Sequence, residues 1–215
     1  MTLAFIDPIE KIIRQRRSIR KYKAVMPQPR WIEAIVECAA LAPSPSNTQP
    51  VRFVRIRSEE KRKALHEAMV RRHRELLERL EESGGPKKTR NLINVYYRYS
   101  DFMFHAPVIL AVGTVPEARS FSGKLAEANI LAEDSRGETD LDISLGLALK
   151  GLLLKCEALG LGSCILTAPL VFVPEAEKVL GLGDVRIKCF VTVGFPDETP
   201  PPIERKGLPE IYREI

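Results

Sequence analysis

The chain has 215 residues, of which 45% are hydrophobic and 28% are charged, and this composition is ordinary for a globular protein. The length is enough for one compact domain with its own core, and no apolar run approaches the roughly 18–20 residues that cross a bilayer. The formal net charge of +5 permits a nucleic-acid partner, so the distribution of the basic residues has to be examined.

Much of the positive charge is concentrated in two regions. The first is the segment 14–23, and the second is the segment 59–90, where acids and bases alternate as on a solvated helix face with i,i+4 pairs. A nucleic-acid-binding protein would show a basic stripe with interleaved aromatic residues, whereas Tyr22 is the only aromatic residue in the first region. We therefore disfavour a non-catalytic protein that binds nucleic acid.

The cysteines and histidines indicate neither a disulfide framework nor a metal site. The four cysteines include no CxxC pair, and each lies in an apolar stretch, where a free thiol behaves as a small hydrophobe. The first ten residues lack the basic and apolar regions of a secretory signal. We expect reduced thiols, no bound metal, no membrane partner and a cytoplasmic location.

The first part of the chain alternates helical and strand patterns. Helical spacing predicts one helix over residues 8–17 and a second from residue 29 or 30 to residue 41. Prolines exclude a helix from residues 42–50. An imperfect alternation predicts a strand over residues 51–57, and Ser58-Glu-Glu begins a long charged helix that runs to about residue 82.

The middle of the chain combines aromatic, apolar and unpatterned segments. An aromatic segment ends at residue 104, and the wholly apolar run at residues 107–113 is typical of a strand buried on both faces. Residues 114–138 are the least patterned, and we expect a loop with a short helix that serves as a lid or a subunit contact. The apolar segment 141–159 predicts a helix that lies centrally or in a subunit interface.

The last part of the chain predicts short elements and an arm. We expect strands at residues 163–166 and 185–194, with a short helix at residues 174–180 between them. Five prolines indicate that residues 195–215 form an extended C-terminal arm. This order of elements predicts an α+β domain around one sheet that takes in the whole chain, residues 1–215.

The first motif with chemical potential is Arg16-Arg17-Ser18-Ile19-Arg20, which follows the first predicted helix. Guanidinium groups match phosphate oxygens with two parallel hydrogen bonds, and a serine hydroxyl adds a neutral donor. The alternative is a solvated basic helix end, which the helix dipole favours. Taken alone, the motif is compatible with both interpretations.

The second motif is the proline-fixed loop at residues 43–50, in which Ser44, Asn47 and Gln49 offer hydroxyl and amide groups. Such a loop can bind the hydrogen-bonding edge of a heteroaromatic ring. A plain turn between helix and strand is the alternative, because the same residue types are common there.

Two further motifs lie in the second half of the chain. After Gly160-Leu-Gly-Ser-Cys, the turn at Thr167-Ala168-Pro169 can present backbone N–H groups to a ligand, or it can simply end a strand. Near the C-terminus, Arg205 and Lys206 either bind an anion or belong to a frayed basic tail.

The order of these motifs resembles that of the nitroreductase-like FMN oxidoreductase family. The resemblance extends from about residue 9 to residue 211 and includes Val-Gly-Phe-Pro at residues 193–196. It implies an α+β fold with a mostly antiparallel sheet flanked by helices. It also implies an intertwined homodimer with two FMN molecules at the interface.

The resemblance also implies roles for particular residues. Arg16, Arg17, Ser18 and Arg20 would hold the FMN phosphate and ribityl chain and approach the ring, with Arg205, alone or with Lys206, completing the phosphate site. Ser44, Asn47 and Gln49 would come from the partner subunit. The backbone of Leu166, Thr167 and Ala168 would lie near the flavin N5.

The chemistry that the resemblance implies is carried by the cofactor. FMN would take a hydride from NADH or NADPH and reduce a small-molecule electron acceptor in the same pocket, while the protein supplies binding and electrostatics. Hydride transfer requires no acid or base, so we expect no catalytic side chain. Arg20 is our candidate for stabilising negative charge at the ring edge. The sequence decides neither the physiological acceptor nor the nucleotide.

Two features depart from the family pattern. Val51-Arg52-Phe53 follows Pro50, where many relatives have an aromatic residue directly after the proline, and the charged helical and aromatic segment 59–104 is longer than in minimal members. Residues 96–98 of that segment could line the substrate pocket. The other enzymatic alternative is a specialised relative, such as a reductive dehalogenase or a flavin-destroying enzyme, with residues 114–138 as its lid.

Overall fold

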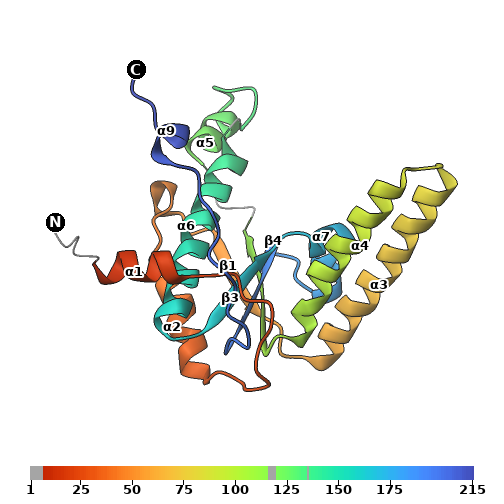
Figure 1. Cartoon of the computed structure of the whole chain (residues 1–215). Helices are drawn as coiled ribbons and strands as arrows, with labels where there is room; N and C mark the ends of the chain where they lie inside the picture. Colours follow the sequence, from red (N-terminus) through yellow and green to blue (C-terminus); the bar gives the residue numbers. More distant parts are fainter. Residues whose placement is uncertain (1–6, 116–119, 135) are drawn as a thin grey trace.

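A computed structural model describes residues 7–115, 120–134 and 136–215 of the chain (Figure 1). Its α-helices are α1 (Pro8–Gln15), α2 (Pro29–Ala40), α3 (Glu59–Glu82), α4 (Lys87–Asp101), α5 (Phe121–Glu127), α6 (Gly137–Ala158), α7 (Pro169–Phe172), α8 (Ala176–Leu180) and α9 (Leu208–Ile211). Two short 3-10 turns, η1 (Pro45–Asn47) and η2 (Phe102–His105), lie between them. No helix in these ranges is both long enough and apolar enough to cross a membrane.

The four strands form one antiparallel sheet. The strands are β1 (Val51–Arg55), β2 (Val108–Thr114), β3 (Gly162–Leu166) and β4 (Arg186–Gly194), and their order in the sheet is β1-β2-β4-β3. Every residue of β2 is buried, as the unbroken apolar run predicted. The α+β fold with an antiparallel sheet is confirmed.

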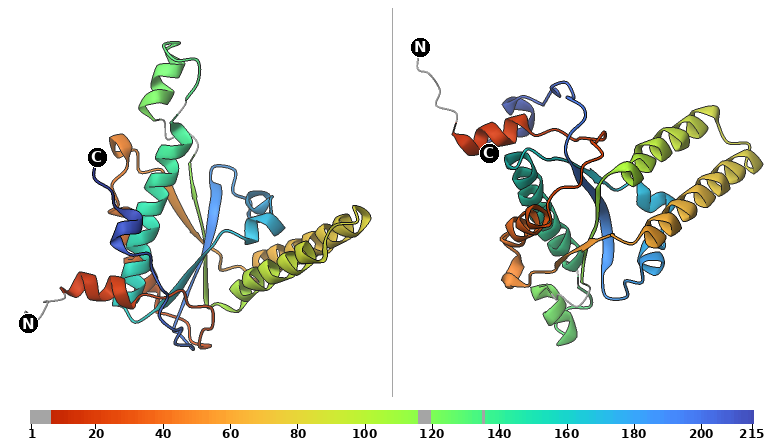
Figure 2. Two further views of the ribbon diagram at one scale, coloured as in Figure 1. Left: turned by 45° about the horizontal axis from the view of Figure 1, so that its top comes forward. Right: turned by 90° about the horizontal axis from the view of Figure 1, so that it is seen from below.

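Helices cover both faces of the sheet (Figure 2). On one face, α2 and α6 pack on alternate residues of β2 and β4, such as Val108 and Val191. On the other face, the bases of α3 and α4 pack with α7 and α8 on the intervening residues, such as Ile109 and Phe190. The alternation of side chains along each strand therefore supplies two separate cores from one sheet.

A long helical hairpin, α3–α4, projects away from the sheet (Figures 1 and 2). Ser58 caps α3 by accepting a hydrogen bond from the Lys61 N–H group, as the sequence signal for the helix start indicated. A 3.0 Å hydrogen bond from His66 to Asp101 joins the helices near their base, and a 2.9 Å hydrogen bond from His73 to Asn94 joins them near their middle. The aromatic segment of the sequence therefore belongs largely to α4, which returns along α3.

Helix α6 begins at Gly137, four positions before the predicted start at Leu141. The carboxylate of Asp134 explains the earlier start, because it accepts the Gly137 N–H group at 2.8 Å and also the hydroxyl groups of Ser120 and Ser122. The same carboxylate therefore fixes both α5 and the start of α6. The predicted lid 114–138 thus contains a helix, while residues 116–119 and 135 lie outside the described ranges.

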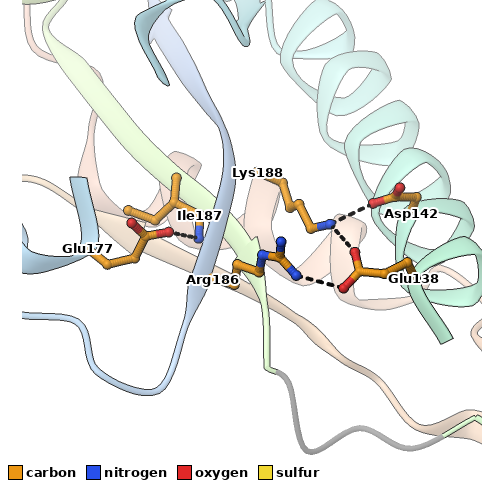
Figure 3. A network of polar contacts seen from close by, with 6 residues as sticks. All are labelled: Glu138, Asp142, Glu177, Arg186, Ile187 and Lys188. Carbon is orange, nitrogen blue, oxygen red and sulfur yellow. Dashed lines mark hydrogen bonds and ion pairs between the residues drawn. The ribbon is translucent and has the colours of Figure 1, made fainter. Parts of the chain in front are cut away.

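Ion pairs attach the first turns of α6 to the sheet (Figure 3). Lys188 on β4 contacts Glu138 and Asp142 at 2.8 and 3.1 Å, and Arg186 contacts Glu138 at 2.7 Å. The hydrogen bond from Lys188 lowers the pKa of the Glu138 carboxyl group, with Arg186 adding to the shift. These cations therefore have carboxylate partners within the fold.

The remaining predicted elements differ from the structure mainly in their ends. The helices predicted at residues 8–17 and 29–41 are present, as are all four strands. The helix predicted at residues 174–180 is present as α8, and α7 is a further short helix that the sequence did not predict. The C-terminal arm is extended apart from α9, and all of its residues from 201 onward are exposed.

Candidate functional site

The segment that contains Arg16 to Arg20 lies along the edge of the sheet beside β3. Ser18 pairs with Ser163 in a parallel bridge, and the Ile19 N–H group donates to the Ser163 carbonyl at 3.1 Å. The Ile19 side chain is buried, whereas that of Arg20 is exposed. The hydrophobic residue therefore anchors the segment in the core and leaves its polar side chains available to a ligand.

A hollow of about 420 Å³ lies at the end of α1, and we call it the cation hollow. It is lined by Ile13, Arg14, Arg16, Arg17, Lys150, Ile203 and Arg205. Five cationic side chains from α1 and the segment after it, from α6 and from the C-terminal arm thus meet in one place.

The five cations of the hollow are not equivalent. Arg14 pairs with Glu10 at 2.6 Å, and the Arg17 guanidinium group donates to the backbone carbonyls of Arg14 and Arg16 at 2.7 and 2.9 Å. Arg17 therefore caps the C-terminal end of α1, which is the role expected of a cation at a helix end. The remaining three are Arg16, Lys150 and Arg205.

Within the described residues, Arg16, Lys150 and Arg205 make no side-chain hydrogen bond and no ion pair. Three such cations around one hollow suit a multiply charged anion, because guanidinium and ammonium groups bind phosphate oxygens through charge-assisted hydrogen bonds. Lys206 does not line the hollow, although it directly follows Arg205.

Lys150 is a residue that the sequence analysis missed. It lies in the apolar stretch that became α6, on the exposed face of that helix. The available signal was a single cation within a long apolar run. Helical periodicity alone did not reveal that this cation faces the end of α1.

Arg20 lies farther along the same segment, next to the hairpin. Its guanidinium carbon is 5.8 Å from the centroid of the Tyr99 ring on α4, which is a cation–π distance. Burial raises the pKa of the Cys164 thiol, while Arg20 and the Ser18 hydroxyl oppose that rise. Arg20 therefore connects the Arg16–Arg20 segment with the base of the hairpin.

A second hollow, of about 480 Å³, adjoins the cation hollow, because Arg14 and Arg17 line both. Glu157 and Glu198 also line it. Burial raises the pKa of the Glu157 carboxyl group, and the positive charges of Arg16 and Arg17 counteract part of this effect. The surface near the segment is thus cationic at the cation hollow and carries both acidic and basic side chains at the second hollow.

The loop with Ser44, Asn47 and Gln49 is organised by its own side chains. The Ser44 hydroxyl accepts the Gln49 N–H group at 2.8 Å, and the Gln49 amide donates to the Asn47 side-chain oxygen at 3.2 Å. Asn47 and Gln49 have φ angles of 53° and 46°, in the left-handed region that non-glycine residues seldom adopt. The loop is therefore held in an uncommon conformation.

The same loop borders a hollow of about 280 Å³ between α2, β1 and α6. This hollow and the cation hollow share no lining residue. Within one chain, the loop and the cations therefore belong to separate surfaces. Leu166, Thr167 and Ala168 lie at the end of β3, where Leu166 is buried, Thr167 is exposed and Ala168 leads into α7.

The sequence and the fold are both similar to those of known proteins. Residues 13–195 match the family described as the Nitroreductase family. An NADH dehydrogenase of Thermus thermophilus is 28% identical over 200 residues, which cover 92% of this chain and 91% of that protein.

Two solved structures show the same fold. A BluB-like flavoprotein from Clostridium difficile 630 has a TM-score of 0.80 at 23% identity, covering 97% of this chain and 99% of that one. A nitroreductase in complex with FMN from Desulfovibrio desulfuricans has a TM-score of 0.70 at 23% identity, covering 97% of both chains.

Proposed function

The chain belongs to the nitroreductase family, and on that premise we propose that it is an FMN-dependent oxidoreductase that moves two electrons from NADH or NADPH to a small organic acceptor. The acceptors that we expect are nitroaromatic compounds, quinones or flavins. The observation that best supports a phosphate-bearing cofactor is the cation hollow, where the side chains of Arg16, Lys150 and Arg205 make no hydrogen bond or ion pair to any described residue.

The cation hollow fits the FMN phosphate. Arg16 and Arg205 bind its oxygens through their planar guanidinium groups, and Lys150 adds a third positive charge. Arg17 fixes the end of α1, because its guanidinium group donates hydrogen bonds to backbone carbonyls there. Its positive charge also adds to the site. Lys206 contributes charge from outside the hollow.

The segment from Ser18 to Arg20 would hold the rest of the cofactor. The Ser18 hydroxyl suits the ribityl chain, and the Arg20 guanidinium group suits the polar edge of the flavin ring. The backbone of Leu166, Thr167 and Ala168 would border N5. The loop with Ser44, Asn47 and Gln49 reaches the ring from the partner subunit, in accord with its separation from the cations within one chain.

When bound, FMN supplies the two-electron chemistry at N5 of its ring. The residues of this chain then have three tasks: they bind the phosphate, they orient the ring, and they stabilise negative charge at its polar edge. Arg20 performs the last of these, because a fixed positive charge in a partly desolvated site interacts more strongly than in water.

The shared site requires a homodimer. Exposed apolar side chains favour such an assembly: Leu41 at the end of α2 is 85% exposed, and Ile143 and Leu147 on α6 are 49% and 44% exposed. Ile211 in the arm is 68% exposed. Burying such side chains on a second copy is favourable, since apolar surface leaves water.

The visible absorbance spectrum of the purified protein tests the function. We expect flavin bands that bleach when NADH or NADPH is added without oxygen. Flavin bands that resist both nucleotides would instead favour a specialised relative with another reductant. If the protein shows no flavin after incubation with FMN, the proposal is wrong.

Two further measurements test the site. The Arg20→Ala variant should retain markedly less FMN after gel filtration, and unchanged occupancy would contradict the role of Arg20. Sedimentation of the wild-type protein should give a dimer in dilute solution. A monomer that retains FMN would contradict the shared site.

A further inference from the structure

The C-terminal arm begins as an antiparallel partner of the segment that carries Arg20. The Lys23 N–H group donates to the Phe195 carbonyl at 2.9 Å, and the Asp197 N–H group donates to the Lys21 carbonyl at 3.0 Å. The start of the arm is therefore held against the segment by backbone hydrogen bonds, although about 175 positions separate the two in the sequence.

Glu198, the next residue of the arm, is bonded to the same segment by its side chain. One carboxylate oxygen accepts the N–H groups of both Arg20 and Lys21, at 2.5 and 3.1 Å. Hydrogen bonds from backbone N–H groups to an ionised carboxylate are stronger than those between neutral groups. Glu198 thus binds two successive peptide groups of the segment.

The neighbouring peptide group is fixed from the other side. The Ile19 N–H group donates to the Ser163 carbonyl of β3. Three consecutive N–H groups, at Ile19, Arg20 and Lys21, are therefore bound by groups from β3 and the arm. This arrangement limits rotation of the backbone at Arg20 and so limits where its guanidinium group can lie.

We propose that Glu198 is a positioning residue for the flavin site, and that its carboxylate holds the Arg20 backbone in the conformation that directs Arg20 to the flavin ring. This inference rests on the proposed function, since the flavin is the ligand that Arg20 contacts. Glu198 acts through Arg20 and needs no contact with the cofactor.

A purely electrostatic role of Glu198 predicts the opposite change in FMN affinity when the carboxylate is removed. Glu198 lines the second hollow together with Arg14 and Arg17, so its negative charge reduces the attraction of that region for a phosphate. If charge alone mattered, removing the carboxylate would tighten FMN binding. If positioning matters, removing it weakens binding.

Titration of the apo-protein with FMN, followed by flavin fluorescence, separates these roles. We expect the Kd of Glu198→Ala to rise about tenfold, since two hydrogen bonds that order the segment are lost. Glu198→Gln should stay within about threefold of the wild type, because the amide oxygen accepts the same two bonds. Glu198→Asp keeps the charge but is one methylene shorter, so it should weaken binding as alanine does.

Glu204→Ala is the matched control. Glu204 is a carboxylate of the same arm, and it makes no hydrogen bond or ion pair within the described residues. The FMN affinity of this variant should equal that of the wild type. A loss as large as that of Glu198→Ala would show that any charge change in the arm has the same effect, and would overturn the proposal.

A double-mutant cycle with Arg20→Ala tests the route of the effect. If Glu198 acts through Arg20, Glu198→Ala should change the Kd less than about twofold in the Arg20→Ala background. An undiminished effect in that background would overturn the proposal. So would equal FMN affinity of the wild type and Glu198→Ala, or tighter binding by Glu198→Ala.

The Gln and Asp variants keep the test decisive if Glu198→Ala does not fold. If Glu198→Asp binds FMN like the wild type and Glu198→Gln does not, the charge of the side chain rather than its position is required. That result would overturn the inference. Wild-type protein that binds no FMN would overturn the proposed function itself. Wild-type binding with no effect at Glu198 would overturn only the present inference.

Discussion

Two regions of this molecule concentrate positive charge, and the fold treats them in opposite ways. On the α3–α4 hairpin, cations are matched by acids: Lys63 lies 3.9 Å from Glu67, and Arg72 lies 3.0 Å from Glu75. In the cation hollow, Arg16, Lys150 and Arg205 form no ion pair with an acid of the described residues.

The difference in how the cations are paired indicates which of the two basic regions is a ligand site. Both regions are rich in basic residues in the sequence, but on the hairpin the acids recur within three or four positions and neutralise the bases locally. The hollow gathers its unpaired cations from residues 16, 150 and 205, and repulsion among them disfavours this arrangement unless an anion binds. Unpaired cations that converge from distant positions therefore indicate function more strongly than basic residues that are close in sequence.

The largest effect should come from removing both guanidinium groups of the hollow. We expect the Arg16→Ala/Arg205→Ala double variant to raise the Kd for FMN about a hundredfold, because each charge-assisted hydrogen bond to phosphate contributes about 1.5–3 kcal/mol. Fluorescence titration measures the change. Lys206→Ala is the control and should stay within about threefold, and a comparable loss there would place the phosphate outside the hollow.

Lys150→Ala should have a smaller but clear effect. We expect the Kd for FMN to rise about tenfold, because an ammonium group binds as a point charge without the two-pronged geometry of arginine. Lys150→Met, which keeps an unbranched side chain without the charge, should behave as alanine does. Affinity equal to the wild type in both variants would exclude Lys150 from the phosphate site.

The ion pairs at the start of α6 should affect stability rather than binding. The pKa of Glu138 is lower in the folded protein than its ordinary value of 4.5, so its contribution is present above that pH and is lost as the pH falls through the folded pKa. Because Glu138 is largely exposed, the loss should be below about 1 kcal/mol. Thermal unfolding between pH 7 and pH 3 measures it, and Glu138→Gln should show a shallower decline.

The smallest effect should come from the hairpin. Lys63→Ala removes one exposed i,i+4 ion pair with Glu67, and we expect a loss of at most about 0.5 kcal/mol in unfolding free energy. The Kd for FMN should not change. A loss of flavin affinity in this variant would erase the contrast between the two basic regions.

Local sequence patterns predicted most of the secondary structure, because interactions between residues close in the sequence determine most of these elements. The cap at Ser58, the prolines of the 43–50 loop and the apolar run of β2 each act within a few residues. The start of α6 was misplaced because Asp134, which accepts the Gly137 N–H group, lies outside the apolar pattern that marked the helix. Side-chain hydrogen bonds of this kind override hydrophobic periodicity at helix ends.

The site was predicted less completely, for a related reason. Arg16 and Arg205 were expected together on the strength of a resemblance, and the structure brings both to one hollow. Lys150 was missed because its position there depends on how α6 packs relative to α1. Arg17 was grouped with the expected phosphate ligands through the same resemblance, and its guanidinium group donates hydrogen bonds to the end of α1.

Gly162 in β3 lies so close to Ile19 that no side chain fits at this position. A Cβ atom at this position would lie 2.6–2.8 Å from three side-chain atoms of Ile19, including its branched Cβ. Because Ile19 is buried, it cannot turn aside, and the segment with Arg16 and Arg20 would have to move outward. Under the proposed function, a lineage that replaced this glycine would keep its sheet but bind flavin less well, so position 162 should vary only among descendants that no longer use flavin.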